Sequence, residues 1–456
     1  MKRTGSLGAG RWLGASALLA GGACASYRPA PLPAGPDVQA SVASLKVDIS
    51  RIRLQPLRSI AIDPRAGFTP LAVAVLAVLN NPDLQAKRAA LGVPAAQVFA
   101  ASLLPDPQIT AGVDQPIAGP DTHTAYNASP SLDIAGMLAR ASSVRAARFT
   151  ASQANLNVLW AEWTTAQQAR QLAETALADE ARAAFLRRIL TAAADRSDHS
   201  ERALGRGDVT AQTAAADLAA KLDVETSLAT AEHDAQKARR DLAALLGLDA
   251  SVALPLIPDP ETGVYAPAEV ARDLADLPAR RPDLLALRAG YSAQDANLRK
   301  AILAQFPLAS IAFAYARDPT PTTTLGLSAV FALPIFNGHR GDVRVQEATR
   351  AQLRAEYQAR LDQTDAEVKN AAAEEAAALA RAVALRADLP RLQAMLEPAP
   401  AAYARGDIDS QAWLALLQAV IGKQAEFEDR ELAARMAEIQ LETALFAPPA
   451  QRAGKS

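Results

Sequence analysis

The chain has 456 residues and a net charge of −2, with 49 acidic and 47 basic side chains. General nucleic-acid binders carry a basic excess, so this balance argues against that class. Aromatic residues are only 5% of the chain, alanine is abundant, and glycine and proline fall in clusters, a composition that favours long helices. The single cysteine excludes an internal disulfide.

Residues 1–23 have the features of a secretory signal peptide: a basic start, a short apolar stretch at 13–20, and small residues before Cys24. The apolar stretch is too short to cross a bilayer as a helix. Cys24 stands where bacterial lipoproteins are acylated, and it is our lipidation candidate. Acyl chains would add membrane affinity of ~0.8 kcal/mol per buried CH₂. The alternative is ordinary cleavage after Ala25, which the small residues around Cys24 also fit.

Residues 24–68 are predicted to form an N-terminal tether and extended segment, because prolines cluster early in it and its remainder shows no clear pattern. Helical patterning begins at Thr69-Pro70, where threonine can cap a helix and proline can occupy its first turn. We expect a helix from Leu71 to Leu104, kinked or broken by Pro94.

Strand patterns follow at residues 108–115 and 125–134, where polar and apolar residues alternate over about ten positions. Two similar patterns lie in the second half, at residues 310–315 and 324–333. Such alternation predicts two hairpins whose strands each have one apolar and one polar face. The length and pattern suit tilted transmembrane β-strands.

Very long helices are predicted after each hairpin. Residues 137–204 contain no glycine or proline, and one helix of that length would reach about 100 Å, beyond a globular diameter. A turn and a second uninterrupted run, 208–246, follow. The second half repeats this order with helices predicted from Asp342 past Pro390 and on to Phe446.

The two halves form an internal repeat. Pro82-Asp83-Leu84 recurs as Pro282-Asp283-Leu284, and Gly207-Asp208-Val209 recurs as Gly406-Asp407-Ile408, both at an offset of about 200 residues. We therefore predict a first repeat at 69–250, a connector at 251–275, a second repeat at 276–446, and a disordered tail at 447–456.

Four strands cannot close a barrel, for which about eight are needed. An open sheet edge is not tolerated in lipid. Closure by other copies of the chain is therefore expected, and a homotrimer would give a 12-stranded β-barrel. The alternative is a soluble helical protein with two surface hairpins.

The chain resembles the TolC-type outer-membrane efflux proteins of Gram-negative bacteria, from about Thr69 to Phe446. Departures from the family pattern are Pro94 and the degenerate corner at 133–137. The resemblance is carried by the order and duplication of six segments: Asn80-Asn81-Pro82-Asp83-Leu84, Arg280-Arg281-Pro282-Asp283-Leu284, Leu103-Leu104-Pro105, Gln305-Phe306-Pro307, Leu333-Pro334-Ile335-Phe336-Asn337-Gly338 and Tyr403-Ala404-Arg405-Gly406-Asp407.

The resemblance implies a mainly α fold with a small transmembrane β part: a long α-helical barrel and a 12-stranded β-barrel completed by a homotrimer. It implies a passive outer-membrane channel, lipid-anchored on the periplasmic side. That channel would carry drugs or metal ions from a periplasmic adaptor (membrane fusion) protein and an inner-membrane pump of the resistance-nodulation-division type. Alternatives are a type I secretion conduit and a lipid-anchored periplasmic coiled-coil scaffold.

The resemblance also places the turns between paired helices, 204–208 and 405–409, at a periplasmic tip where the adaptor docks. Rings of aspartates near an aperture favour cations. Helix capping is the alternative role of Asp208 and Asp407. The candidate residues are the turn glycines Gly205, Gly207 and Gly406, the aperture aspartates Asp208, Asp407 and Asp409, and the arginines Arg206 and Arg405, which could pair with them.

No catalytic pattern is found. There is no phosphate-binding loop, no dinucleotide-binding glycine pattern and no nucleophile elbow. We expect no enzymatic activity, no cofactor, no metal site and no nucleic-acid partner. The four histidines are scattered without metal-ligand spacing: His123, His199, His233 and His339.

Overall fold

The computed structural model describes residues 27–58, 60, 62, 66–120, 123–259, 265–306, 309–320, 322–331, 333–405 and 407–447. The chain divides into two units, Met1–Val38 and Gln39–Ser456. In the first unit, residues 27–38 are exposed and form no helix or strand. The predicted signal peptide, Cys24 and residues 448–456 of the predicted tail lie outside the described residues, whereas Ala447, the first residue of that tail, is described and buried. All the helices and strands of the described residues belong to the second unit.

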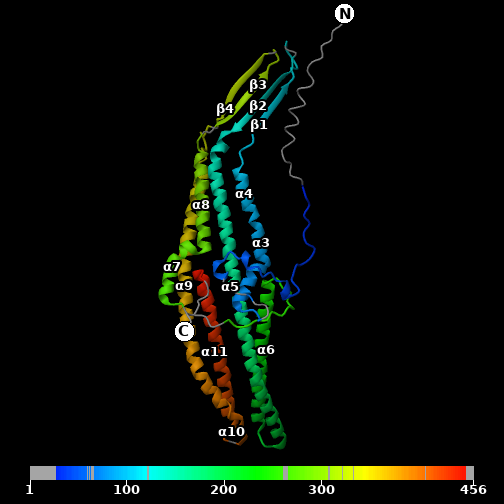
Figure 1. Cartoon of the computed structure of the whole chain (residues 1–456), viewed down its shortest axis with the longest axis vertical. Helices are drawn as coiled ribbons and strands as arrows, with labels where there is room; N and C mark the ends of the chain where they lie inside the picture. Colours follow the sequence, from blue (N-terminus) through cyan, green and yellow to red (C-terminus); the bar gives the residue numbers. More distant parts are fainter. Residues whose placement is uncertain are drawn as a thin grey trace. The chain divides into compact units, whose positions relative to one another are not determined.

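Most of this unit is helical, with one small sheet (Figure 1). Three short 3-10 helices, η1 Val42–Ser44, η2 Ile49–Arg51 and η3 Gln55–Leu57, precede the first long elements. In chain order the elements are α2 Pro70–Asn80, α3 Pro82–Ala90, α4 Gly92–Ser102, β1 Gln108–Asp114, β2 Ala125–Asp133, α5 Ile134–Arg206, α6 Ala211–Leu245, α7 Pro267–Arg280, α8 Pro282–Leu303, β3 Ala309–Arg317, β4 Thr323–Phe331, α9 Arg340–Leu396, α10 Ala399–Arg405 and α11 Ser410–Leu445.

The four strands form one antiparallel sheet in the order β1-β2-β3-β4. Directly paired residues of antiparallel strands lie on the same face. Val113 pairs with Tyr126, and two residues further along β2 Ala128 pairs with Tyr315, which pairs with Leu325. The register therefore gathers the apolar positions of all four strands on one face, as the alternating sequence predicts.

The opposite face of the sheet carries small and polar residues, apart from Val330 of β4, which pairs with Ser310. One row across it runs from Gly112 to Asn127, then to Ala316 and Thr324. The outer edges of β1 and β4 pair with no other strand in the part of the chain that the structure describes. The sheet is thus amphipathic and open at both edges.

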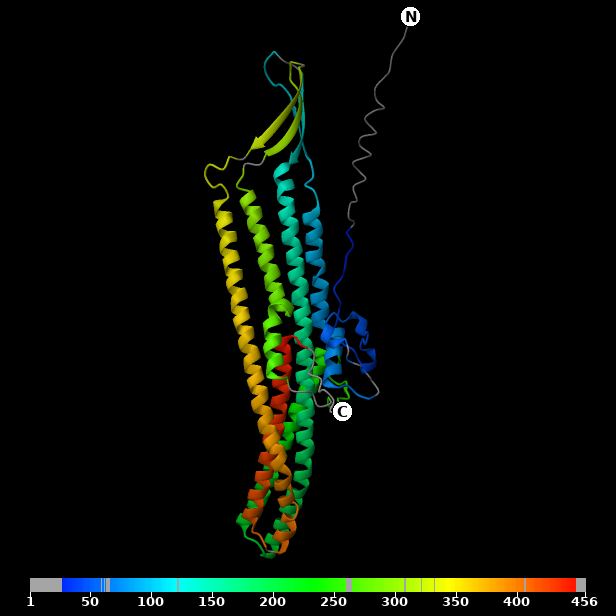
Figure 2. The same ribbon diagram turned by 60° about the vertical axis from the view of Figure 1, so that its left-hand side comes forward.

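Each strand is joined to a helix, and all four junctions lie at the same end of the sheet. Helix α4 leads into β1, α5 follows β2, α8 leads into β3, and α9 follows β4. Figure 2 shows these helices as neighbouring rods in the order α4, α5, α8, α9. Helix α5 has 73 residues and α9 has 57, and both run on past the ends of α4 and α8 to pack with α6 and α11. Among the residues described, no helix combines the length and apolarity needed to cross a bilayer.

Both Pro-Asp-Leu segments begin a helix that is stacked on the end of another. Asn81 and Arg281 precede the two prolines, and their ψ values of 125° and 122° lie outside the helical region, which a residue before proline avoids. Asn81 Nδ2 donates to the carbonyl of Leu245 at 2.8 Å, and Arg281 Nη1 donates to the carbonyl of Ala444 at 3.0 Å. The residue before each proline thereby binds the C-terminal end of α6 or α11.

Pro94 breaks the helix that the sequence predicts over residues 71–104, as expected. Proline cannot donate to the carbonyl four residues earlier, and α3 ends at that residue, Ala90. Helix α4 then begins at Gly92. A further break at Asn81 was not predicted, although Pro82 is its cause.

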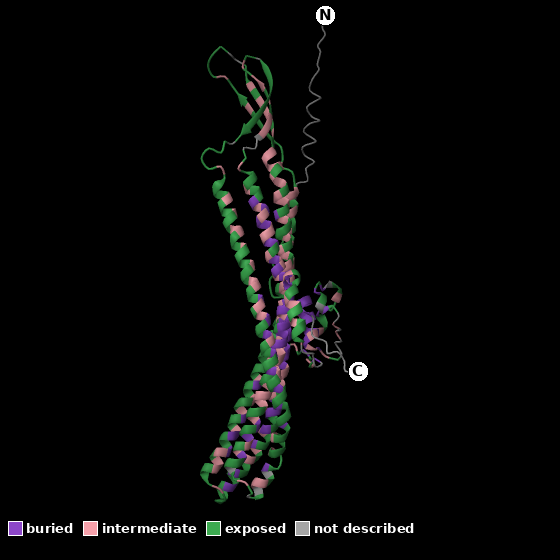
Figure 3. Cartoon of the chain, turned by 90° about the vertical axis from the view of Figure 1, so that its left-hand side faces the viewer, coloured by how far each residue is buried: buried purple, intermediate pink, exposed green. Residues whose placement is uncertain are grey.

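The described residues from Gln39 to Phe68 belong to the second unit and pack against its helices. Ile52, Leu54 and Leu57 are buried against α2 and against Trp163 of α5. Backbone bridges join Gln39 to Leu248, just after α6, and Phe68 to Leu256 in the connector, so both ends of the segment are tied to residues that follow α6. Figure 3 shows buried residues concentrated midway along α5 and among the lower helices, whereas the strands are exposed or half-buried. We call this buried region, around Trp163 midway along α5, the waist.

Candidate functional site: the helix turns and the waist

The turn between α5 and α6 is closed by Gly207. Its φ of 79° is left-handed, which only glycine adopts without strain. The amide of Asp208 donates back to the carbonyl of Ala203 at 2.9 Å, as in a Schellman-type helix end. Gly205 lies inside the last turn of α5. Of the two glycines predicted to make this turn, Gly207 is the one whose backbone requires it.

The turn between α10 and α11 has the same hydrogen bond. The amide of Asp407 donates to the carbonyl of Ala402 at 2.9 Å, again over five residues. Gly406 lies outside the described residues. The two turns that the sequence relates at an offset of about 200 residues thus share a backbone pattern.

An arginine and an aspartate pair within each turn. Arg206 Nε donates to Asp208 Oδ2 at 2.8 Å, and Arg405 Nε donates to Asp407 Oδ2 at 2.8 Å. All four side chains are more than half exposed, so each pair contributes little to stability. Each arginine neutralises an aspartate of its own turn, and neither pair joins the two helix hairpins.

The helix caps are not the residues that the sequence suggests. Thr210 caps α6 by accepting a hydrogen bond from the amide of Thr213, and Asp409 caps α11 by accepting one from Ala412 at 2.7 Å. Asp208 and Asp407 face arginines instead. Of the three predicted aperture aspartates, Asp409 therefore has a backbone amide as its partner.

One buried arginine joins the two hairpins near their turns. Arg196 on α5 donates from Nε to Asp217 Oδ1 on α6 at 2.9 Å, and Ser200 Oγ also donates to Asp217. The guanidinium carbon of Arg196 lies 3.4 Å from the ring centre of Tyr403 on α10 and 4.7 Å from that of Trp413 on α11. We call these four residues, Arg196, Asp217, Tyr403 and Trp413, the tip clamp.

Sequence reasoning missed the tip clamp, although one signal for it exists. Arg196 and Asp217 stand at nearly equal distances before and after Gly207, so an antiparallel helix hairpin places them side by side. The contact of Arg196 with Tyr403 and Trp413 has no such signal, because it joins segments about 200 residues apart.

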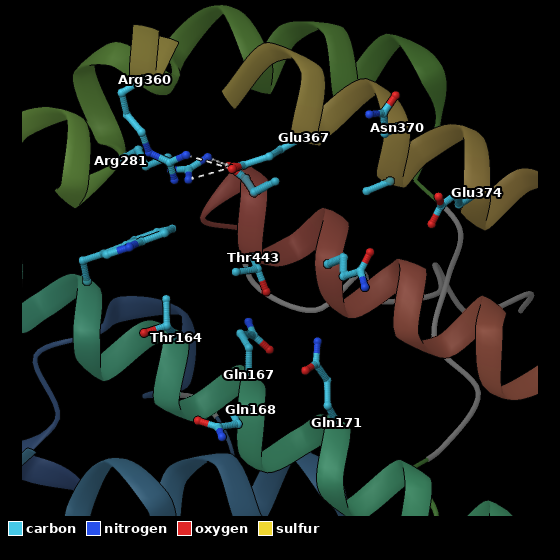
Figure 4. A pocket seen from close by; sticks show the side chains of 14 residues that line it. Thr164, Gln167, Gln168, Gln171, Arg281, Arg360, Glu367, Asn370, Glu374 and Thr443 are labelled. Carbon is cyan, nitrogen blue, oxygen red and sulfur yellow. Dashed lines mark hydrogen bonds and ion pairs between the residues drawn. The ribbon is translucent and has the colours of Figure 1, made fainter. Parts of the chain in front are cut away.

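A cavity of about 520 Å³ lies at the waist between α5, α9 and the end of α11 (Figure 4). Arg281 forms one wall: it is almost fully buried, it donates to Glu367 at 3.1 Å, and its guanidinium lies 4.5 Å from the Trp160 ring centre. Arg360 donates to the same carboxylate at 2.8 Å. The facing wall, on α5, carries Thr164, Gln167, Gln168 and Gln171, whereas Asn370 lies on α9, on the same side as Glu367.

This wall of ion pairs gives the second Pro-Asp-Leu segment its role. Asp283 accepts from Arg281 Nε and from Arg360 Nε, each at 2.8 Å. Both arginines are thus fully engaged in binding α8 to α9. The cavity offers hydrogen-bonding groups but no activated nucleophile.

Buried carboxylates gather beside this cavity. Burial raises the pKa of Glu174 to about 6 and that of Glu375 to about 7, the latter with added repulsion from Glu438 and Glu442. Arg170 forms a buried ion pair with Glu442. Several carboxyl groups are therefore close together where α5, α9 and α11 meet, and each disfavours the charged form of its neighbours. No group of three or more His, Cys, Asp or Glu side chains in the described residues is arranged to hold a metal ion.

Comparisons with known proteins identify the architecture. No protein-family model matches the chain, and no curated protein sequence matches it. Solved structures do match. A membrane protein from Pseudomonas aeruginosa has a TM-score of 0.71 at 19% identity, covering 92% of this chain and 99% of that chain. The CmeC outer-membrane channel of Campylobacter jejuni has a TM-score of 0.69 at 15% identity, covering 94% and 96%.

CusC, a protein described as forming a transmembrane channel, matches with a TM-score of 0.68 at 18% identity, covering 90% of this chain and 98% of that chain. The chain has the TolC-type fold. The resemblance carried by the sequence motifs is thereby confirmed at the level of fold. Within the TolC-type fold, the amphipathic sheet lies at one end of α5 and α9, and the turns of the two helix hairpins lie at the other end.

Proposed function

We propose that the chain is the outer-membrane conduit of a tripartite efflux system and works as a homotrimer. The observation that carries this proposal is the sheet: four strands, one apolar face, one polar face and two open edges. Such a sheet is unfavourable in water and, left open, in lipid. Three copies joined edge to edge would close it into a 12-stranded barrel with its apolar face toward lipid.

The helices support the same closure. Because α4, α5, α8 and α9 follow the order of the strands, joining β4 to β1 of the next copy brings α9 beside α4 of that copy. A helical barrel would then continue the strand barrel. The matched junctions at Asn81 and Arg281 support a two-fold repeat within each copy.

The conduit is passive in this proposal, and an inner-membrane pump of the resistance-nodulation-division type supplies the energy through a periplasmic adaptor. Drugs or metal ions are the proposed cargo. The turns at Gly207 and Asp407 form the adaptor-facing tip, and acylation of Cys24 anchors the chain. Similarity to outer-membrane channels such as CmeC supports this assignment.

The test uses the full chain purified in detergent. We expect a trimer that resists SDS until it is heated, and discrete conductance steps in planar bilayers. A soluble, elongated monomer without conductance would instead support the periplasmic scaffold. Deleting the gene would separate the cargo classes, by measuring the sensitivity of the cells to drugs, their sensitivity to metal salts and their secretion of proteins. Acylation is tested separately: Cys24→Ser should abolish labelling by radioactive palmitate.

A further inference from the structure

Among the described residues, the loop from Leu333 to Gly338, which joins β4 to α9, is a highly exposed apolar segment outside the sheet. Phe336 is 98% exposed, and Leu333 and Ile335 are also exposed. Large apolar side chains that gather in one exposed place mark an interaction site. This loop is therefore the strongest candidate for an unassigned contact.

The loop has a fixed shape. The amide of Ile335 donates to the carbonyl of Leu333 at 2.9 Å, and the amide of Arg340 donates to that of Asn337 at 3.1 Å. Gly338 and His339 are both left-handed, with φ of 53°, and His339 directly precedes α9. A loop held in this way presents Phe336 outward without a large loss of conformational entropy on binding.

A hollow lies beside the exposed ring. A cavity of about 450 Å³ is bounded by Leu333 and Phe336 on the loop, by Phe306 at the end of α8, and by Ala135 at the start of α5. Its lining is mostly apolar, and its volume could hold one or two leucine-sized side chains. The loop and the hollow together form a receptor for an apolar projection.

A matching projection lies at the opposite edge of the same layer. Leu103 and Leu104 form the corner between α4 and β1, and both are exposed. The corner precedes the first residue of β1, and the loop follows the last residue of β4. Because β1 and β4 are antiparallel to their neighbours and run in opposite directions, both features lie at the helix end of the sheet.

We propose that the loop 333–338 receives the Leu103-Leu104 corner of the neighbouring copy. The inference rests on the proposed trimer, because pairing the free edge of β4 with β1 of the next copy brings the two features to the same height. A contact of this kind is heterologous and repeats around a closed ring. It seals the junction between the strand barrel and the helix barrel, where neither strand pairing nor long helix packing covers the seam.

Cysteine cross-linking tests this contact in the full chain. The double variant Phe336→Cys with Leu104→Cys should give covalent trimers on oxidation that survive heating in SDS and disappear on reduction. Each single variant, which keeps Cys24, should give none. A wild-type protein that forms heat-sensitive trimers while the double variant gives no covalent product would overturn the contact and leave the proposed function standing.

A charge substitution gives a second readout. Phe336→Asp should lower the temperature at which the trimer dissociates in SDS, and Ile117→Asp is the matched control. Ile117 is 99% exposed in the loop at the other end of the sheet, away from the seam. Equal dissociation temperatures for the two variants would count against the contact.

A fluorescence measurement tests whether the loop faces lipid. If the fluorescence of Phe336→Trp is quenched by brominated lipid, the loop faces the bilayer and the inference is wrong. If the wild-type chain forms no trimer at all, the proposed function fails first.

Discussion

The central carbon of the Arg196 guanidinium lies over the ring of Tyr403, 3.4 Å from the ring centre. The same side chain forms an ion pair with Asp217, whose carboxylate is fully buried. The rings and the carboxylate together replace the hydration that the guanidinium loses on burial, and removing either charge would leave the other buried without a partner. Arg196 thus couples the α5–α6 hairpin to the α10–α11 hairpin near their turns.

Removing this arginine should loosen the turns. Arg196→Ala leaves a buried carboxylate without its charge partner, and we expect a loss of about 3–5 kcal/mol of unfolding free energy. In planar bilayers the same variant should show a larger conductance, because the two hairpins can separate. Chemical denaturation and single-channel recording measure the two effects.

The control for Arg196 is Arg206→Ala, which removes an exposed arginine that pairs within its own turn. It should cost less than about 1 kcal/mol. Similar stability and conductance changes in both variants would show that the tip clamp has no special role.

The aperture charges can be separated from helix capping at Asp409. Asparagine caps a helix about as well as aspartate does, so Asp409→Asn removes the charge and keeps the cap. We expect an unchanged melting temperature and a lower cation selectivity, measured as the reversal potential across a salt gradient. Asp409→Ala, which loses both, should also destabilise α11 by about 1 kcal/mol.

The arginine–aspartate pairs make an opposite prediction. Arg405→Gln releases the negative charge of Asp407, so cation selectivity should rise. Adding Asp407→Asn to that variant should reverse the gain. If neither change moves the reversal potential, the turns do not line the conducting path.

Arg281 should be far more important for stability than the arginine beside it. Its side chain is almost fully buried and donates to Asp283, to Glu367 and to the carbonyl of Ala444. We expect Arg281→Ala to cost about 3–5 kcal/mol, because these acceptors lose a buried cation. Arg280→Ala is the matched control, since Arg280 is exposed and lies 3.6 Å from its carboxylate partner. Equal melting temperatures for the two variants would contradict the role of Arg281 in joining α8 to α9 and α11.

The waist should be more stable in mild acid. Burial raises the pKa of Glu375 to about 7 from an ordinary value of 4.5. A carboxyl with a raised pKa contributes stability that is complete below its unfolded value and is lost as the pH rises through its folded value. Melting temperature should therefore fall between about pH 5 and pH 8.

Glu375→Gln should flatten that pH dependence and stabilise the protein at pH 8 by on the order of 2 kcal/mol. Glu374→Gln, a neighbouring exposed carboxylate on the same helix, is the control and should leave the slope unchanged. A slope that persists in Glu375→Gln would assign it to other groups, among which Glu174 is the first to substitute, because its pKa is also raised, to about 6.

Local patterns in the sequence were sufficient to predict most elements of this protein. Period-two alternation predicted the four strands, and the long stretch without glycine or proline predicted α5, because both signals act within one element. Even the apolar face of the sheet follows from alternation once the strands are paired. Pro94 breaks a helix through the backbone of the residues beside it, which is again local.

Only the tertiary structure decided which of the candidate charges are exposed and which are buried. The sequence singled out Asp208 and Asp407, which form exposed pairs inside their own turns. It did not single out Arg196, whose partners Tyr403 and Trp413 come from the other repeat. Ile52, Leu54 and Leu57 belong to a segment that lacks periodicity, and their position likewise depends on packing against α2 and α5. Contacts between distant segments depend on how helices are brought together, and spacing within one segment does not encode that.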